Sequence, residues 1–444
     1  MKRRDMIRTG AILGGGALAL SSREANARER AARQWESTYS GGTLAVKAKP
    51  PVLPGQGYRP VVTPNGGSVP FEVIKGVKVF HITASEMEHE FTPGLKALCW
   101  GYNGRVNSTT IEAVEGERVR IYVTNRLKVP TTIHWHGLYL PNGMDGISGL
   151  TQRPIEPGET FRYEWTLRQY GTYMFHSHHD TMTQEAMGLI GSFIVHPRSP
   201  SRDEIVDRDF SLLMSEWSIE PGARRPNPME MTDFNVLTFN GRAFPGTAPL
   251  VVKTGDRVRI RLGNLSAMDH HPIHLHGYRF KITATDGEKI PKSAQWPETT
   301  ALVAVGQTRD IEFIADAPGD WLLHCHMTHH IMNQMGHDLP NLLGVDARDF
   351  DQKVRRLVPG YMTMGQGGMS GMSKMKMPTP ENTVAMKSNP GPFGSLSVGG
   401  MFTLLKVRDQ LDSYDEDPGW YKHPAGTVAE AATPEELARD GILT

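Results

Sequence analysis

The sequence predicts an all-β protein built from two Greek-key β-sandwiches. Glycine and proline make up 46 and 31 of the 444 residues, which is typical of a chain whose short strands are joined by many turns. A second observation is an internal repeat. His274-Leu275-His276-Gly277 follows His134-Trp135-His136-Gly137 at a separation close to the length of one small domain. A repeat of that length indicates two copies of one sandwich.

Alternation of apolar and polar residues begins near residue 71 and supports a first domain at residues 71–200. The repeat places a second domain at residues 201–350. The polar, Pro- and Gly-rich stretch 28–70 is predicted to be an N-terminal arm, and residues 351–444 a methionine-rich loop and C-terminal tail. The predicted strands include Phe71–Ile74, Val77–Phe80, Ile111–Val123, Thr160–Leu167 and, within the tail, Met401–Val407.

Residues 1–27 are predicted to be a cleaved export signal. Arg3-Arg4 precede a weakly apolar run from Ile12 to Leu20, and Ala25-Asn26-Ala27 offers a small-residue cleavage site. Paired arginines before a mildly apolar stretch are typical of a twin-arginine signal, which predicts a periplasmic or secreted protein. The alternative, a membrane anchor, is disfavoured because the apolar run is far shorter than about 20 residues.

Charge and cysteine content limit the partners and the crosslinks. The formal net charge is +0, so neither nucleic acid nor an acidic membrane is predicted as a partner. The two cysteines are Cys99 and Cys325. If Cys325 binds a metal, no disulfide can form within the chain, and Cys99 is predicted to be a buried small apolar residue.

The stretch from His324 to Met335 concentrates metal-ligand side chains. In a strand, Cys325 points to one face while His324 and His326 point to the other. The Cys325 thiolate, His330 and Met335 supply three ligands of a blue-copper site, which takes two His, one Cys and a weak axial Met. His324 and His326 can then bind a second metal site on the opposite face, only a few covalent bonds from Cys325.

The sequence contains four His-x-His pairs, far more than random placement predicts, and the pairs occupy equivalent places in the two repeats. Each pair puts two imidazoles on one face of a strand, and imidazole is a good ligand for copper. Eight imidazoles suit three copper ions. The pairs are His134/His136, His176/His178, His274/His276 and His324/His326.

These motifs resemble those of the multicopper oxidases, the family of laccases and copper-resistance oxidases, over residues 90–345. The resemblance implies cupredoxin-like domains and four coppers per chain: one type 1, one type 2 and a type 3 pair. By analogy, His134 and His274 hold the type 2 copper. The type 1 copper is held by His271, Cys325, His330 and Met335, and the type 3 pair by His136, His176, His178, His276, His324 and His326.

The repeat restricts the type 1 site to the second domain. The residues of the first domain that correspond to its four ligands are Thr131, Ser177, Met182 and Met187. Only the last keeps the ligand type, so the first sandwich is not expected to hold a blue copper. Copper nitrite reductases also have two such sandwiches. They resemble this chain less well, because their type 1 site lies in the first domain and they lack the full set of cluster histidines.

The resemblance implies reduction of dioxygen to water by four electrons taken from a small reducing substrate. Cu(I), a phenol or aromatic amine, and Mn(II) are the candidate reductants. The methionines between Met362 and Met377 favour Cu(I), because thioethers select this ion; the alternative is a linker without function. A competing hypothesis is a copper-sequestering export protein without turnover. It explains the methionines but not a type 1 site connected to a cluster.

Oxygen reduction also needs protons, and Asp145 is the predicted source. It follows His136 at a spacing at which related oxidases have a carboxylate that relays protons near the cluster. The alternative is a turn residue, because Asp before Gly146 is a common turn pairing.

The placement of the histidines further predicts a homotrimer with each cluster built between two chains. The cluster needs histidines of both sandwiches, and the stretch between His178 and His271 is too short for a spacer domain. The first domain of one chain is therefore expected to dock on the second domain of its neighbour. Such head-to-tail contacts can close into rings, and two-domain relatives close at three. The alternative is a monomer with a cluster inside one chain.

Overall fold

Two β-sandwiches follow one another along the chain, which confirms the all-β prediction. The computed structural model describes residues 47–334, 348–357, 380–384 and 387–442. The predicted signal peptide, the predicted ligand Met335 and the methionines between Met362 and Met377 lie outside the described residues.

The first sandwich packs a four-stranded sheet against a five-stranded one. The first sheet has the order β1-β5-β9-β8, and the second the order β2-β3-β6-β7 with β4 paired to β3. Side chains of both sheets form one buried core around Trp135, Phe175 and Phe193. The strands are β1 (Gly67–Ser68), β2 (Phe71–Ile74), β3 (Val77–Thr92), β4 (Leu95–Tyr102), β5 (Thr109–Val114), β6 (Arg118–Asn125), β7 (Thr160–Thr166), β8 (Gly171–His176) and β9 (Ile190–His196).

The second sandwich has a seven-stranded and a five-stranded sheet. Their orders are β11-β10-β13-β19-β15-β16, with β17 paired to β15, and β12-β23-β20-β14-β18. One buried core, which includes Ile260, Ile311 and Leu405, joins the two sheets. The strands are β10 (Arg208–Trp217), β11 (Val236–Phe239), β12 (Leu250–Lys253), β13 (Arg257–Asn264), β14 (His271–Leu275), β15 (Phe280–Thr285), β16 (Glu288–Lys289), β17 (Trp296–Glu298), β18 (Thr300–Val303), β19 (Thr308–Ile314), β20 (Gly319–Cys325) and β23 (Phe402–Arg408).

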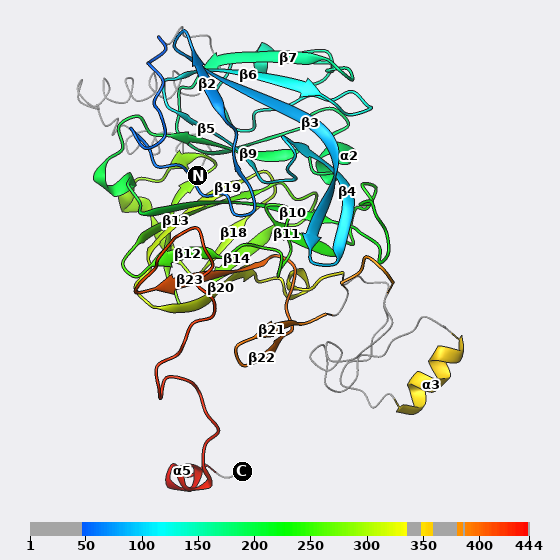
Figure 1. The fold of residues 1–444 in the computed structure, drawn as a ribbon, viewed down its shortest axis with the longest axis vertical. Coiled ribbons are helices and arrows are strands. Elements are labelled where there is room, and N and C mark those ends of the chain that lie inside the picture. The colour runs from blue at the N-terminus through cyan, green and yellow to red at the C-terminus, as the bar shows by residue number, and fades with distance from the viewer. Residues whose placement is uncertain (1–46, 335–347, 358–379, 385–386, 443–444) are drawn as a thin grey trace, which may run out of the picture. The chain divides into compact units, whose positions relative to one another are not determined.

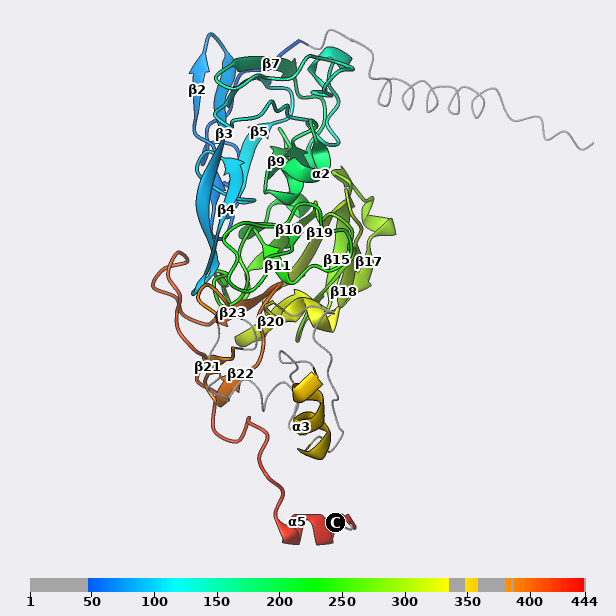
Figure 2. The same cartoon turned by 90° about the vertical axis from the view of Figure 1, so that its right-hand side faces the viewer.

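A strand of the predicted C-terminal tail completes the second sandwich. In both views β23 lies alongside β20 (Figure 1, Figure 2), where it pairs parallel with β12 and antiparallel with β20. In the first sandwich β9 takes the same place, parallel to β5 and antiparallel to β8. The predicted boundary at residue 350 therefore does not enclose the whole second sandwich. The methionine-rich stretch is an insertion between β20 and β23.

Short helices follow the strands that carry the metal-ligand residues. α2 (Thr181–Ala186) follows β8 in the first sandwich, and the 3-10 helix η4 (Thr328–Ile331) follows β20 in the second. Both turn the chain back over the end of the strand just before it. The remaining helices and the outlying hairpin are η1 (Asn142–Met144), η2 (Arg202–Glu204), η3 (Lys292–Ala294), α3 (Arg348–Leu357), α5 (Pro434–Arg439), and β21 (Asn389–Gly391) with β22 (Gly394–Leu396).

Candidate metal centres

The pairing of β14 with β20 sorts the ligand-type side chains of the second sandwich onto two faces. Cys325 lies opposite Ile273, and His324 lies opposite His274. Because side chains alternate along a strand, Cys325 points into the core together with Ile273. His274 and His324 point out of the other face of the same sheet. The predicted separation of a thiolate face from a histidine face is therefore present in the register.

The inward side chains form a compact set of three donors. Cys325 Sγ lies 3.4 Å from His330 Nδ1 and 3.7 Å from His271 Nδ1, and all three residues are buried. The donor atoms of these three residues all lie within 4.8 Å of one another, close enough for one ion to bind all three. One Cys and two His at this spacing are the donor set of a trigonal copper site, so these residues fit a type 1 copper.

Burial holds these donors in the protonation states from which a metal site assembles. Burial lowers the pKa of His271 to about 3, with smaller effects from neighbouring His330 and His270. The imidazole is therefore neutral and keeps a lone pair for a metal. Burial raises the pKa of the Cys325 thiol to about 12, so the metal itself must displace that proton.

The chain just before β23 fixes the position of His330. The His330 backbone oxygen accepts a hydrogen bond from Met401 N at 2.9 Å, and Met401 O accepts one from Cys325 N at 3.0 Å. Gly400 makes this approach possible. Its φ is +61°, and a Cβ at this position would lie 2.1 Å from His330 O. A non-glycine residue here would push His330 out of place.

The outward histidines of the second sandwich form a second group. His274, His276, His324 and His326 have ring centroids 4.8–5.7 Å apart in five pairs. The Nε2 atoms of His276 and His324 face one another at 3.1 Å. Burial lowers the pKa of both rings, which leaves these nitrogens available to a metal.

The first sandwich carries a matching group on β8 and on the segment that bridges to it. His134 pairs with His176 in an antiparallel bridge, and the rings of His134, His136, His176 and His178 lie 5.2–6.0 Å apart. His136 Nδ1 lies 3.3 Å from His176 Nε2. Burial lowers the pKa of His136 to about 4, with further lowering by His176 and His134.

The two groups are oriented by the same kind of backbone contact. His176 and His324 each place Nδ1 against the carbonyl oxygen of the following residue, at 2.9 and 2.8 Å. His134 and His274 each place Nδ1 against a carbonyl of a neighbouring segment, Asp145 O at 2.9 Å and Thr299 O at 2.7 Å. An Nδ1–H that donates to a carbonyl leaves Nε2 as the metal-binding atom. The repeat seen in the sequence therefore extends to the orientation of the rings.

Asp145 lies beside the first group. Its Oδ1 is 3.4 Å from His134 Nδ1, the same nitrogen that donates to its backbone carbonyl. Gly146 allows this loop to come so close, because its φ is +82° and a Cβ there would lie 1.7 Å from Ile133 O. Asp145 ends the 3-10 helix η1, and the loop that follows brings its carboxylate to a predicted ligand.

Glu185 was not predicted from the sequence, yet it contacts the same group. Its Oε1 lies 2.7 Å from His176 Nδ1. Burial lowers the pKa of His176, but the Glu185 carboxylate outweighs this effect, so the pKa is raised overall. Only the turn of α2 brings Glu185 back over β8, and the local sequence gives no sign of this contact.

In the first sandwich, uncharged residues joined by hydrogen bonds occupy the places of the candidate type 1 ligands. Ser177, in the place of the cysteine, shares a hydrogen-bond network with Thr131 and Gln184, in which Gln184 Oε1 accepts from Ser177 Oγ at 2.5 Å and from Thr131 Oγ1 at 2.7 Å. Met182 is half exposed, at 50%, so it does not replace a ligand. These contacts agree with the expectation that this sandwich lacks a type 1 site.

A pair of acidic residues near the type 1 candidate was also missed. Asp269 Oδ2 lies 3.4 Å from His330 Nε2, and Glu216 Oε1 accepts hydrogen bonds from the backbone N–H groups of Met268 and Asp269. Burial, and then the Asp269 carboxylate, raise the pKa of Glu216 to about 8.

The other cysteine, Cys99, is fully buried with no disulfide partner, as predicted.

Family models and relatives agree with these centres. Two models described as multicopper oxidase match residues 83–200 and 220–342, together more than half of the chain. Copper resistance protein A of Escherichia coli is 27% identical over 54% of this chain and 45% of its own length. Laccase-2 of Botryotinia fuckeliana is 29% identical over 61% of this chain and 51% of its own length. The chain thus spans about half the length of these curated relatives.

Solved structures of similar fold bear related titles. The structures titled "Multicopper Oxidase mgLAC" and "Blue Copper Oxidase from Nitrosomonas europaea" each match with a TM-score of 0.55 and 26% identity. Each match covers 74% of this chain, and 86% and 85% of the respective structure. No helix among the described residues is long and apolar enough to cross a membrane. With its two β-sandwiches, its donor sets and these matches, the chain belongs to the multicopper oxidase family.

Proposed function

We propose that this protein is an oxygen-reducing multicopper oxidase with four coppers per chain. The observation that carries the proposal is the presence, in one chain, of a buried Cys-His-His set and two histidine groups of the same construction. A copper-sequestering protein would have no need for a thiolate placed between two histidine-bearing positions of one strand. Here Cys325 lies directly between His324 and His326 on and just after β20.

The ligand assignment is the one that the resemblance to multicopper oxidases implies. His271, Cys325, His330 and Met335 would hold the type 1 copper. His134 and His274 would hold the type 2 copper. The type 3 pair would be held by His136, His176, His178, His276, His324 and His326. When bound, these coppers would supply one-electron steps at the thiolate site and four-electron reduction of dioxygen at the cluster.

The chain's own residues would orient the ligands and supply protons. Asp145 is the proposed proton relay, because its carboxylate reaches His134 at 3.4 Å and lies partly in solvent, at 31% side-chain exposure. Glu185 is placed to hold the ring of His176 in one orientation. Carboxylates that hydrogen-bond ligand histidines fix the tautomer and raise the basicity of the ligand.

Cu(I) is our first proposal for the reductant, ahead of a phenol or aromatic amine. Two exposed thioethers flank the type 1 candidate in the sequence: Met268, 55% exposed, precedes His271, and Met327, 40% exposed, precedes His330. Thioethers favour Cu(I), and the methionines between Met362 and Met377 have the same chemistry. Mn(II) and sequestration without turnover are the alternatives.

Oxygen uptake distinguishes these possibilities. Uptake would be measured with a phenol, with Cu(I) and with Mn(II), on the copper-loaded protein. Cu(I)-dependent uptake supports the first proposal, and Cu(I) binding without any oxygen consumption would contradict oxidase function. Deletion of residues 362–377 is expected to lower Cu(I) oxidation more than phenol oxidation. An equal loss with both substrates would favour the linker interpretation of this segment.

We further propose that the protein assembles as a homotrimer with clusters between chains. Each of the ring contacts described above joins two histidines of the same group. On the side that faces its own second sandwich, His136 lines a cavity of about 310 Å³ with Gly306, Gln307 and Asp286 rather than with histidines. The second group would then come from a neighbouring chain. A monomer with an intrachain cluster is the alternative.

Two inactive variants test this arrangement. One lacks the imidazoles of His176 and His178, and the other those of His324 and His326. Mixed and reassembled, they are expected to regain part of the activity if each cluster joins two chains, because some interfaces then contain two intact groups. No regained activity, together with a monomer mass near 49 kDa by light scattering, would contradict the trimer.

We also propose twin-arginine export to the periplasm. Replacing both Arg3 and Arg4 with Lys is expected to block this export.

A further inference from the structure

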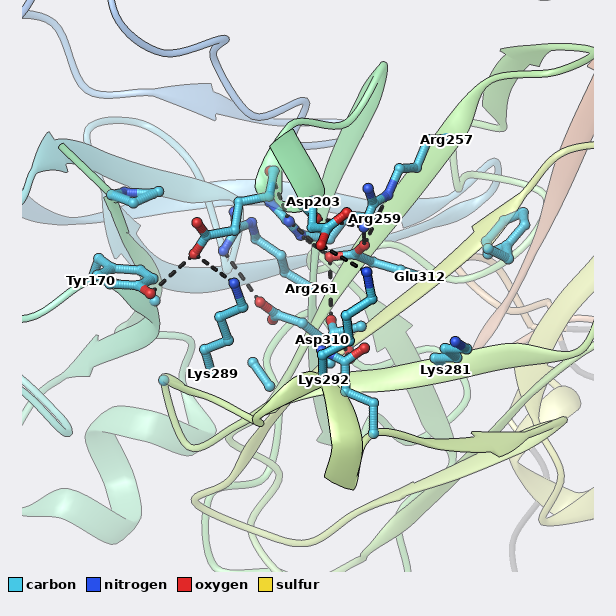
Figure 3. Close-up of a pocket in the computed structure, with 18 of the residues that line it drawn as sticks. Tyr170, Asp203, Arg257, Arg259, Arg261, Lys281, Lys289, Lys292, Asp310 and Glu312 are labelled. Carbon is cyan, nitrogen blue, oxygen red and sulfur yellow. Dashed lines mark hydrogen bonds and ion pairs between the residues drawn. The ribbon is translucent and has the colours of Figure 1, made fainter. Parts of the chain in front are cut away.

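A cavity of about 400 Å³ lies between the two sandwiches, away from the histidine groups. One side is the outer face of the seven-stranded sheet, where β13, β15 and β19 run side by side. The other side is formed by Tyr170 and Gly171 at the start of β8, by Val195 and Pro197 at the end of β9, and by η2. Figure 3 shows the charged side chains that converge there. Its size is at the lower end of the range for small-molecule sites, about 300–1,000 Å³.

The floor of the cavity is a lattice of buried ion pairs. Val258, Ile260 and Leu262 of β13 face the core, so alternation turns the three arginines between and beside them, Arg257, Arg259 and Arg261, to the cavity.

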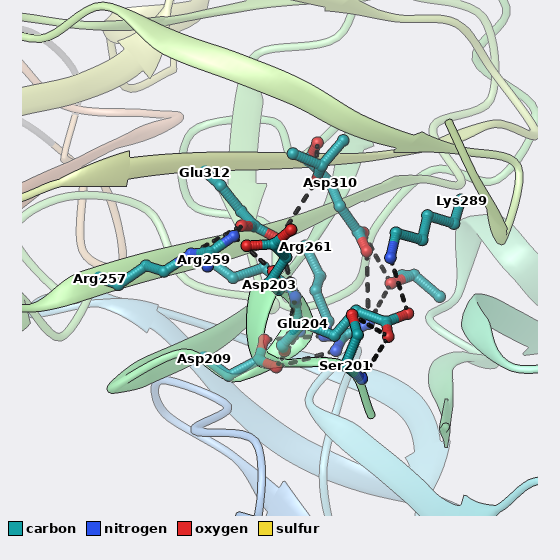
Figure 4. Close-up of polar contacts among 12 residues, drawn as sticks. Ser201, Asp203, Glu204, Asp209, Arg257, Arg259, Arg261, Lys289, Asp310 and Glu312 are labelled. Carbon is teal, nitrogen blue, oxygen red and sulfur yellow. Dashed lines mark hydrogen bonds and ion pairs between the residues drawn. The ribbon is translucent and has the colours of Figure 1, made fainter. Parts of the chain in front are cut away.

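Cross-strand register sets Arg259 opposite Glu312 and Arg261 opposite Asp310. Arg261 also holds Asp209 with two contacts of 2.7 and 2.8 Å, and Arg259 reaches Glu312 at 2.7 Å (Figure 4). Three arginines therefore face three carboxylates, and the floor is neutral and rigid.

The wall near η2 is also neutral. Lys289 Nζ lies 3.0 Å from Glu204 Oε1, and Lys292 Nζ lies 2.9 Å from Asp203 Oδ2. Tyr170 donates its hydroxyl hydrogen to Glu204 at 3.0 Å. These contacts tie the linker between the sandwiches to the edge of β16 and to η3.

Two further cations remain after these pairs are counted. Arg279 and Lys281 line the same cavity, and within the described chain neither has a carboxylate partner. Figure 3 shows Lys281 apart from the cluster of ion pairs. The site therefore has an excess of two positive charges. Both residues are exposed, and cations beside a cavity with low-dielectric walls attract anions more strongly than isolated surface cations do.

Apolar groups share the lining with these charges. Pro197, Ala284 and Ile314 contribute to the cavity surface, and Ile314 lies on the same side of β19 as Asp310 and Glu312. An inorganic oxyanion would leave this apolar surface in contact with water, whereas a short carbon chain would cover it. A ligand with two carboxylates joined by such a chain matches both the charge and the surface.

We propose that this cavity binds a small organic dianion that carries two carboxylates on a short carbon chain. Arg279 and Lys281 supply the charge that selects it, and the neutral lattice below holds the walls in place. This binding does not depend on the copper centres, so its test can fail without affecting the proposed oxidase function, and the reverse.

Isothermal titration calorimetry on the copper-loaded protein tests the proposal, with succinate as the probe and ionic strength held constant. Phosphate is the comparison anion, and copper content is measured before and after each titration. The test variant is Arg279→Gln/Lys281→Gln. The matched control is Lys253→Gln/Lys422→Gln, which removes the same charge at two exposed lysines outside the cavity.

Succinate is expected to bind the wild type and the control saturably, with one site per chain, and to bind the test variant at least tenfold more weakly. Absence of saturable succinate binding would overturn the proposal. So would an equal loss in the control pair, or phosphate binding as tight as that of succinate. Thermal melting shows whether the test variant is folded. Should it unfold, the single variant Lys281→Gln is titrated instead and is expected to bind succinate more weakly than Lys253→Gln.

Discussion

Cys325 Sγ lies 3.4 Å from His330 Nδ1 in the core of the second sandwich. The two residues reach this position by different routes: Cys325 ends β20, and His330 is carried back over it by η4. The chain before β23 then fixes both through backbone hydrogen bonds to Met401. The donor set therefore depends on a segment that follows it by some seventy positions in the sequence.

Gly400→Ala is expected to weaken the type 1 site without unfolding the sandwich. A Cβ would meet His330 O at 2.1 Å, so the His330 backbone must shift and the ring with it. Displacing a ligand by losing its support lowers metal affinity about 10–100-fold. Copper titration followed by the visible band measures this loss. Gly419→Ala is the control, because Gly419 also has a positive φ of 75° but has open space around it. An equal effect of both changes would mean that strain, not contact with His330, is responsible.

Asp145→Asn is expected to slow oxygen reduction while copper content stays unchanged. The amide keeps the size of the side chain but cannot deliver a proton beside His134. General acid–base catalysis contributes about 10²–10⁴-fold, so steady-state oxygen uptake will show the loss clearly. Turnover equal to that of the wild type across the pH range would contradict the relay. Asp412→Asn, at an exposed position, should change nothing.

Glu185→Gln is expected to lower copper affinity at the cluster rather than the rate of proton delivery. The carboxylate holds His176 Nδ1 at 2.7 Å, and a neutral amide binds that N–H less strongly. Copper content after dialysis against a chelator should fall, while the type 1 band remains. Full copper retention in Glu185→Gln would show that the contact of His176 Nδ1 with the Ser177 carbonyl is sufficient to orient the ring.

Glu216 predicts a pH dependence of folding stability. Burial raises its pKa to about 8 from the ordinary glutamate value of 4.5, so between these values the folded protein keeps a proton that the unfolded chain releases. Stability then falls as pH rises through this window, by up to about 1.4 kcal/mol per pH unit for one proton. Urea unfolding between pH 5 and 8 should show a flatter profile for Glu216→Gln. Identical slopes in the variant and the wild type would contradict a protonated Glu216.

The sequence predicted the features that local periodicity determines. Alternation around Cys325 separated the thiolate face from the histidine face, and the recurrence of the His-x-His pairs led to two sandwiches. It did not place β23 in the second sandwich, because strand pairing across a long insertion leaves no local pattern. Glu185 and the Arg261–Asp209 pair were missed for the same reason: each contact joins elements that only the fold brings together.

We propose above that Cys325 is the thiolate of a type 1 copper in a four-copper oxidase. The most direct test compares copper content and visible absorption of the wild type and Cys325→Ser. We expect four coppers and a strong blue band in the wild type. In the serine variant we expect three coppers, no band and no oxygen uptake, because the band requires the thiolate. A serine variant that stays blue, or a wild type that never shows the band when loaded with copper, would contradict it.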